Sequence, residues 1–370
     1  MAATGQRDPT AKRLARAAYR NLRGLHTTVD AVLPRHAQTR VFYGGALSGN
    51  VGGPLVKVQR LSEYFPNTPW RYDLVYLLSN TPYLPQYALD LLKWRNVPIV
   101  LNQNGVFYPA WFPGDWKSQN KRMQIYHQNA DWVFYQSQFC KDCCAQFLGG
   151  RPGGGEVLYN AVDCNRFTPG PKRRSRFRLL HTGKIGRHMA YRVEAAINGL
   201  AAAVASGFDG ELLIAGSLDA WARDAADRAV EQRGLDDRVI FRGAFTQAEA
   251  PGIYSDADAY ISMTYNDACP NAVLEALACG LPVVHSNTGG VPELVGSEAG
   301  VGVDCPQSFE QVHVPDPDAI GHAMMTVVDN HARMSIAARE RCVERFDIKH
   351  WINRHSEIFA QLLGNQGRQH

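Results

Sequence analysis

The 370-residue sequence has no apolar run long enough to cross a membrane, and its N-terminus lacks the apolar core of a signal peptide. A spanning helix needs about 20 consecutive apolar residues, and a secretory signal needs an apolar stretch near the start. Both absences predict a cytoplasmic protein. Hydrophobic residues make up 45% of the chain and charged residues 20%, as in globular proteins with a folded core. The length favours two domains.

The chain also lacks a recognisable set of metal ligands. Its eight cysteines are dispersed; Cys140, Cys143 and Cys144 are close together, but no second pair or nearby histidine completes a tetrahedral site. Two Asp-x-Asp pairs, at 256–258 and 316–318, are interpreted as structural rather than as magnesium ligands. The sequence therefore predicts reduced thiols and no metal. A redox role for the three clustered cysteines is less favoured than an interpretation as small residues on a helix.

An excess of positive over negative charge is found only in the first segment. Residues 1–40 contain eight Lys or Arg and two Asp, so the formal net charge of +4 is concentrated there. A basic footprint for nucleic acid along the whole chain is absent. Residues 8–25 predict an amphipathic helix, whose apolar face carries Leu14, Ala18, Leu22 and Leu25. We favour docking of this face on the body of the protein, or partial disorder of the segment, over binding to an anionic membrane surface.

The most informative segment covers residues 266–280, where a loop becomes a helix. Pro270 suits the first helical position, and Gly280 suits the residue just past the helix end. Asn271 and Glu275 are four residues apart and share one face. Free N–H groups at a helix start favour a phosphate, whereas a carboxylate beside it suits a pair of sugar hydroxyls. The segment predicts a nucleotide-sugar site; an ordinary surface helix is the alternative.

Strand-like and helix-like segments alternate along the rest of the chain. Strand patterns precede residue 150 at 39–43, 73–78, 98–101 and 131–135, and follow it at 179–183, 211–216, 239–243, 257–262 and 281–284. This alternation predicts an α/β fold with parallel sheets, in which ligands bind beyond the carboxyl ends of the strands. The glycine-rich stretch 149–155 is typical of a domain boundary.

A glycine loop that contains Gly52 and Gly53 follows the first predicted strand and precedes a helix. Such a loop brings backbone N–H groups to a phosphate. It lacks the Gly-Lys-Ser/Thr ending of a P-loop, so a nucleoside triphosphate site of that kind is excluded. A plain turn is the alternative.

Residues 266–296 closely resemble the donor-binding signature of family-4 retaining glycosyltransferases of the GT-B fold. That signature has an acidic residue eight positions before a Glu, in the context Pro-Asn-x-x-x-Glu-Ala-x-Ala-x-Gly-x-Pro-Val-Val, and then Gly-Gly-x-Pro-Glu-Leu-Val. The chain matches it with one departure: Asp267 stands where the family usually has Glu. The resemblance extends from about residue 40 to the end and is strongest over 159–296.

The resemblance implies two Rossmann-like domains that face a cleft, preceded by a basic helical lead at residues 1–38. The N-terminal, acceptor-side domain would cover residues 39–158. The C-terminal, nucleotide-sugar-binding domain would cover residues 159–345. Residues 346–370 would form a helix that crosses back onto the first domain.

The resemblance also assigns residues to the donor sugar and its nucleotide. Asp267, with backbone groups near Ala268 and Cys269, would hold the sugar. Glu275 would bind the ribose hydroxyls, and Asn271 would join it at the start of the same helix.

The diphosphate would be neutralised by two cations and by the glycine loop. Lys184 stands at the position of the family's Arg, and a lysine supplies a point charge that suits a phosphate. For the second cation we adopt Arg187, although Arg192 also flanks the expected place. Gly52 and Gly53 would face the same phosphates from the first domain.

Together these features imply a retaining hexosyltransferase of polysaccharide biosynthesis. It would move a sugar from a nucleotide-diphosphate sugar to a hydroxyl of a glycan or lipid-linked glycan, without metal or cofactor. Asn104 stands where the family often has His, so an amide replaces an acid–base side chain near the sugar. The aromatic-rich segment 106–112 is either an acceptor contact or a packed loop. Two other functions stay open: a nucleotide-sugar isomerase on this fold and a non-catalytic nucleotide-sugar-binding protein.

Overall fold

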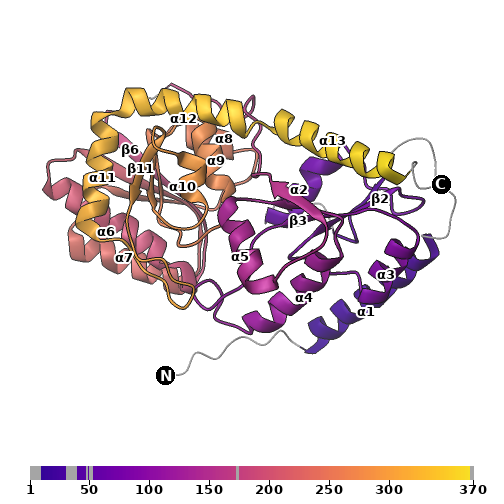
Figure 1. The fold of residues 1–370 in the computed structure, drawn as a ribbon. Coiled ribbons are helices and arrows are strands. Elements are labelled where there is room, and N and C mark those ends of the chain that lie inside the picture. Colours follow the sequence, from indigo (N-terminus) through magenta and orange to yellow (C-terminus); the bar gives the residue numbers. More distant parts are fainter. Residues whose placement is uncertain (1–9, 31–39, 47–48, 50–52, 172–174, 367–370) are drawn as a thin grey trace. The chain divides into compact units, whose positions relative to one another are not determined.

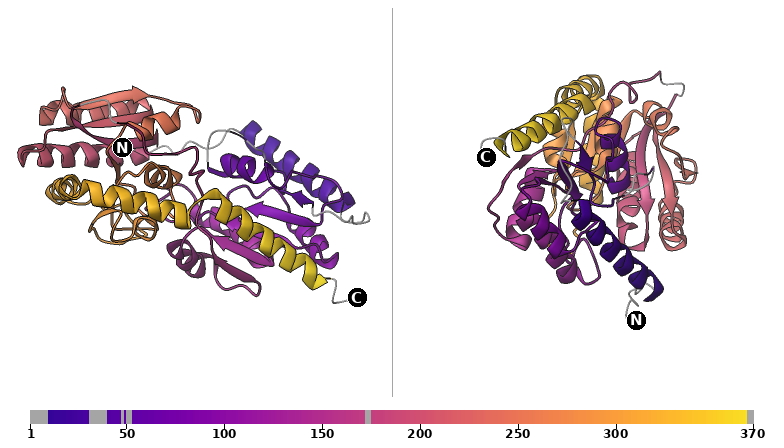
Figure 2. Two further views of the ribbon diagram at one scale, coloured as in Figure 1. Left: turned by 90° about the horizontal axis from the view of Figure 1, so that it is seen from above. Right: turned by 90° about the vertical axis from the view of Figure 1, so that its right-hand side faces the viewer.

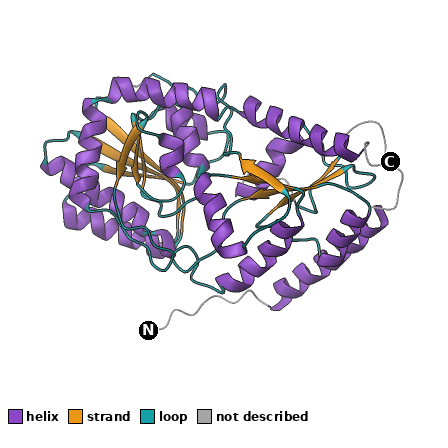
Figure 3. Ribbon diagram, in the orientation of Figure 1, coloured by secondary structure: helices purple, strands orange, loops and turns teal. Residues whose placement is uncertain are grey.

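In a computed structural model the chain forms two compact units (Figure 1). The first unit contains residues 1–159 and 351–370, and the second contains residues 160–350. The structure describes residues 10–30, 40–46, 49, 53–171 and 175–366. Each unit carries one parallel sheet with helices packed against it (Figure 3). The predicted α/β class with two parallel sheets is therefore confirmed.

The sheet of the first unit has five strands in the order β1-β2-β3-β4-β5, and every pair is parallel. The strands are β1 (Val41–Phe42), β2 (Leu74–Leu78), β3 (Ile99–Gln103), β4 (Trp132–Tyr135) and β5 (Gly154–Val157). The helices are α1 (Thr10–Asp30), α2 (Gly53–Ser62), α3 (Gln86–Trp94), α4 (Trp116–Asn129) and α5 (Gln138–Leu148). Strands β2 and β3 are buried along their whole length, as expected of a parallel sheet covered on both faces.

Helix α1 packs on the first unit beside α3 (Figure 2), but through a different face from the predicted one. The Tyr19 hydroxyl donates to the Gly45 carbonyl at 2.8 Å, and the Tyr72 hydroxyl donates to the Thr27 carbonyl at 3.3 Å. The predicted docking face is wrong, because its leucines are the exposed residues: Leu14 is 65%, Leu22 66% and Leu25 61% exposed. Tyrosine packs its ring and still satisfies its hydroxyl, which the apolar pattern alone did not reveal.

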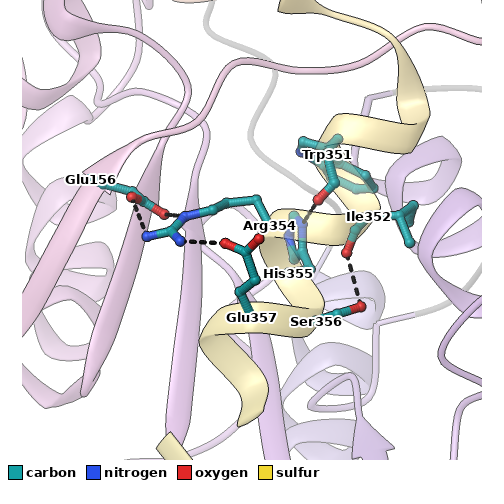
Figure 4. A network of polar contacts seen from close by, with 7 residues as sticks. All are labelled: Glu156, Trp351, Ile352, Arg354, His355, Ser356 and Glu357. Atoms are coloured by element: carbon teal, nitrogen blue, oxygen red, sulfur yellow. Dashed lines mark hydrogen bonds and ion pairs between the residues drawn. The ribbon is translucent and has the colours of Figure 1, made fainter. Parts of the chain in front are cut away.

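Helix α13 (Ile348–Gln366) begins in the second unit and joins the first unit from Trp351 onward. This confirms the predicted return of the C-terminal helix. Arg354 forms a two-pronged ion pair with Glu156 of β5, at 2.8 and 2.9 Å (Figure 4). The next residue, His355, lies 2.9 Å from the Tyr76 hydroxyl in the core. Charge-assisted forks of this kind fix orientation as well as position.

The sheet of the second unit has six parallel strands in the order β11-β10-β9-β6-β7-β8. Its strands are β6 (Phe177–Ile185), β7 (Gly210–Leu218), β8 (Val239–Gly243), β9 (Ala259–Ser262), β10 (Val283–Ser286) and β11 (Gly300–Val303). The direction of winding reverses between the first strand, β6, and the fourth, β9. This is the Rossmann order, in which ligands bind beyond the carboxyl ends of the strands at the reversal.

Helices cover both faces of this second sheet (Figure 3). They are α6 (Tyr191–Ala205), α7 (Ala220–Arg233), α8 (Ala250–Ser255), α9 (Asn271–Ala278), α10 (Val291–Val295), α11 (Pro317–Asp329) and α12 (His331–Arg345), with a short 3-10 helix at Arg187–Met189. The core lies between α6, α11 and the sheet, where Val193, Leu200 and Ile320 are fully buried.

Buried histidines predict that stability falls in acid. Burial lowers the pKa of His355 to about 3, and the pKa values of His127 and His181 to about 4. The unfolded chain takes up protons near pH 6.5 that the folded chain excludes. Stability is therefore lost as pH falls below that value, by roughly 1.4 kcal/mol per pH unit for each such histidine. His355→Gln should flatten the decline of the thermal midpoint measured between neutral pH and about pH 4.5.

His350→Gln is the matched control, because His350 is exposed and lies near the start of the same helix. It should keep the wild-type pH dependence. An unchanged slope in His355→Gln would remove His355 from this account.

Candidate functional site

The predicted site residues of the second unit follow its two central strands. Lys184 is exposed near the end of β6, which extends two residues further than predicted. Asp267 follows β9, the neighbour of β6. The backbone N–H of Tyr265 donates to the Tyr191 hydroxyl at 3.1 Å, so the loop after β9 is tied to the helix that follows β6. The strand reversal therefore brings these groups to one edge.

The Asp267 loop is held in a fixed shape by its neighbours. The Asp267 carboxylate accepts the Cys269 N–H at 3.1 Å, and its carbonyl accepts the Gly290 N–H at 2.8 Å. Gly289 has a φ of +70°, and a Cβ there would lie 2.6 Å from the Asp267 carbonyl. The Gly-Gly pair of the signature therefore serves a close approach of two loops. Asn266 has a φ of +53°, a strained value of the kind found at functional sites.

Hydrogen bonds from Asn160 to Cys269 also hold this loop in place. The Asn160 side chain donates to the Cys269 carbonyl at 2.9 Å, and the Asn160 backbone N–H donates to its sulfur at 3.4 Å. Ala268 and Cys269 are both buried. This role of Asn160 was not predicted; its place in the resembling segment after the domain boundary was the only signal.

The two candidate second cations lie in different surroundings. Arg187 lies over the Trp221 ring, 5.1 Å from its centroid, and its backbone N–H donates to Asp219 at 2.8 Å. Arg192 acts on Asp267 instead: burial raises the pKa of the Asp267 carboxyl, and the charge of Arg192 opposes that rise. The charge of Arg192 therefore acts on the acidic residue, while the adopted Arg187 lies against Trp221.

Helix α9 begins at Asn271, with Pro270 as its cap residue, so the predicted start was one residue early. Gly280 follows the helix end with a φ of +69°, as predicted. Glu275 is 8% exposed. The Oδ1 atom of Asn271 is buried with no hydrogen-bond partner among the described residues. Buried polar atoms are almost always satisfied in folded proteins, so this oxygen suits a ligand group or a water.

Glu275 lies in a buried polar cluster with residues from three other elements, β6, α8 and β9. The Tyr254 hydroxyl is 2.8 Å from Thr182 Oγ1, which is also 3.1 Å from the Tyr260 hydroxyl. Burial and then the neighbouring Glu275 carboxylate raise the pKa of Tyr254 well above its usual value. Sequence reasoning did not predict this cluster, because its members are far apart along the chain.

A second polar cluster lies at the carboxyl ends of the strands of the first unit. The buried Lys57 Nζ donates to Asn102 Oδ1 at 2.6 Å and to Asn104 Oδ1 at 2.8 Å. The Gln136 amide also donates to both oxygens, and the Asn104 N–H donates to Ser79 Oγ at 3.0 Å. Asn104 therefore belongs to a network built around an ammonium group.

Lys57 was missed at the sequence level. A lysine between Val56 and Val58 in a predicted helix was its only signal. Gly53 starts α2, the helix that carries Lys57. Gly52 lies outside the described residues.

Neither a metal centre nor a membrane span is found within the described residues. They contain no group of three or more His, Cys, Asp or Glu that is able to hold a metal ion. None of their helices is both long and apolar enough to cross a membrane. Cys140, Cys143 and Cys144 are buried on α5. Burial raises the pKa of Cys144 well above its usual value, which disfavours the reactive thiolate.

Two α/β units with parallel sheets and a C-terminal helix that returns to the first unit define the GT-B fold. Anabaena HepE, solved in complex with UDP, shares this fold with a TM-score of 0.63 at 20% identity, over 84% of this chain and 82% of that one. Sucrose-phosphate synthase from Thermosynechococcus elongatus gives 0.62 at 18% identity, over 85% and 83%.

Residues 176–330 match the family described as Glycosyl transferases group 1, which confirms the resemblance for most of the second unit. The chain is 28% identical over 186 residues to the GDP-mannose-dependent alpha-(1-6)-phosphatidylinositol dimannoside mannosyltransferase of Mycobacterium tuberculosis. It is 29% identical over 149 residues to the D-inositol 3-phosphate glycosyltransferase of Paenarthrobacter aurescens. These matches cover 50% and 38% of this chain but only 43% and 36% of the relatives. The chain thus spans less than half the length of either relative.

Proposed function

We propose that the chain is a glycosyltransferase that moves a hexose from a nucleotide-diphosphate sugar to an acceptor hydroxyl with retention. The observation that carries this proposal is that Lys184 lies near the end of β6 while Arg192 and Asp267 lie on the segments that follow β6 and β9, at the strand reversal between these two strands. These residues lie within the region that matches Glycosyl transferases group 1. The printed name of one relative specifies GDP-mannose, and HepE was solved with UDP; both support a nucleotide-sugar donor.

Each residue has a chemical task in this proposal. Negative charge grows on the diphosphate as the bond to the sugar breaks, and Lys184, Arg192 and the N-terminus of α9 stabilise it. Asp267 accepts hydrogen bonds from hydroxyl groups of the sugar. Glu275 and Asn271 accept hydrogen bonds from the ribose hydroxyls. Because these cations and the helix terminus neutralise the phosphates, the reaction needs neither metal nor cofactor.

The acceptor is a glycan or lipid-linked glycan, and α1 contacts an anionic membrane from its cytoplasmic side. The support is the exposure of Leu14, Leu22 and Leu25 on a helix that also carries arginines. Such a helix lies in the membrane interface with its apolar face inserted. One relative is named for a phosphatidylinositol acceptor, in agreement with a lipid-linked substrate.

Glu275→Gln should weaken nucleotide binding by roughly tenfold, because one charge-assisted hydrogen bond to the ribose is lost. A screen of UDP-, GDP- and ADP-sugars by hydrolysis and thermal stabilisation first identifies the nucleotide. Calorimetry then gives its affinity. Glu298→Gln is the control, since Glu298 is exposed and paired with Arg333. Equal affinities for the wild type and Glu275→Gln would exclude the ribose role.

Arg192→Met should lower the turnover rate by about tenfold or more, as expected when a group that stabilises transition-state charge is removed. Arg187→Met should change it far less, because Arg187 lies against Trp221. Lys184→Ala should resemble Arg192→Met. The measurement is the rate of sugar transfer or donor hydrolysis at saturating donor. The opposite ranking of the two arginine variants would restore Arg187 as the second cation.

Replacing Leu14, Leu22 and Leu25 together by Ser should abolish co-sedimentation with anionic vesicles, since the inserted apolar surface is removed. The thermal midpoint should stay unchanged because these side chains are exposed. Ile336→Ser, at an exposed apolar position on α12, serves as the control. Vesicle binding that survives the triple substitution would refute the membrane contact.

A further inference from the structure

The first unit contains a cavity of about 470 Å³ whose walls carry three arginines. Arg16 and Arg20 reach it from α1, and Arg122 reaches it from α4. The turn after β2 contributes Asn80 and Tyr83. No carboxylate is among the described residues that line it. The function proposed above does not use this cavity.

The cavity adjoins the polar cluster at the carboxyl edge of the first sheet. Asn80 Oδ1 accepts a hydrogen bond from Asn104 Nδ2 at 2.7 Å, and Asn104 accepts one from Lys57. The Tyr83 ring meets the Tyr19 ring edge-on at 5.2 Å, which fixes α1 against the turn. The arginines of α1 are therefore held at the edge of the parallel sheet where ligands bind.

Three guanidinium groups around one cavity make its surface positively charged, which favours the binding of an anion. Guanidinium groups present planar pairs of N–H donors that match phosphate oxygens, and arginine stays charged at any physiological pH. The volume lies within the range of roughly 300–1,000 Å³ found for small-molecule sites. It therefore accommodates a phosphate together with the ring or polyol that carries it.

We infer that this cavity binds the phosphate group of a phosphorylated sugar or polyol, and that this compound is the acceptor. The role as acceptor rests on the proposed function, whereas phosphate binding does not. The phosphate belongs either to a free compound or to a lipid headgroup. In both cases the arginines hold the phosphate and leave the hydroxyl groups of the compound available for transfer.

Calorimetry on the full chain tests the inference with glycerol 3-phosphate and glucose 6-phosphate, each against its unphosphorylated parent. Co-sedimentation with phosphatidylglycerol vesicles, against phosphatidylcholine vesicles, tests the lipid source. Saturable binding of either phosphorylated probe identifies a free compound. Binding of the anionic vesicles alone identifies a headgroup if the double variant Arg20→Met/Arg122→Met weakens it, whereas vesicle binding that this variant leaves unchanged belongs to the leucines of α1. The inference requires that whichever probe binds does so at least tenfold more weakly in the double variant Arg20→Met/Arg122→Met.

Two matched variants keep the test sharp. Lys121→Met removes a neighbouring exposed charge of α4 that does not line the cavity, and it should bind like the wild type. Arg20→Lys/Arg122→Lys keeps the charge but loses the guanidinium fork; it should bind with intermediate affinity, and it replaces the double Met variant if that variant fails to fold.

The inference is overturned if no phosphate probe binds, or if the double Met and Lys121→Met variants bind equally well. Nucleotide affinity measured in parallel separates the two proposals. It should be the same in the wild type and the double Met variant. Absence of nucleotide binding together with intact phosphate binding would refute the proposed function, while the cavity would remain a phosphate site.

Discussion

The reversal of strand order between β6 and β9 is the constraint on which the site of the second unit depends. Parallel strands present their carboxyl ends at one edge, and connections that wind in opposite directions from adjacent strands leave that edge open. Lys184 lies near the end of β6 and Arg192 follows this strand, whereas Asp267 follows β9. No direct pairing between the segments is needed to bring them together. Local contacts then fix the loops at this edge. For example, the absence of a Cβ at Gly289 allows its loop to approach the backbone of Asp267.

Both units keep polar groups in surroundings where charge is costly. In the second unit the mostly buried Glu275 lies beside Tyr254. In the first unit Lys57 is 7% exposed and donates to the amide oxygens of Asn102 and Asn104. Burying a charge costs free energy unless hydrogen bonds compensate. A polar group held in a low dielectric interacts strongly with a ligand and needs little rearrangement when the ligand binds.

The first and the last described helix are both attached to the first unit, by different means. Helix α13 joins it through the ion pair of Arg354 with Glu156 and through the buried His355. Helix α1 uses Tyr19 and Thr27 and leaves its leucines outside. An amphipathic pattern indicates that a helix has two different faces, but it does not indicate which face packs against the rest of the protein. Arg16 and Arg20 of α1 line the cavity because the helix packs on the first unit through its polar face.

The sequence by itself determined the α/β class, the return of the last helix and the end of α9 at Gly280. These features follow from local periodicity, turn residues and a long, specific motif, all of which are encoded within short stretches. Tertiary structure decided the rest. The action of the Arg192 charge on Asp267, the hydrogen bond of Asn160 to Cys269 and that of Lys57 to Asn104 depend on which side chains come into contact after folding. Such contacts arise from strand order and from packing between residues that are distant in the chain. Neither produces a periodic pattern in the sequence.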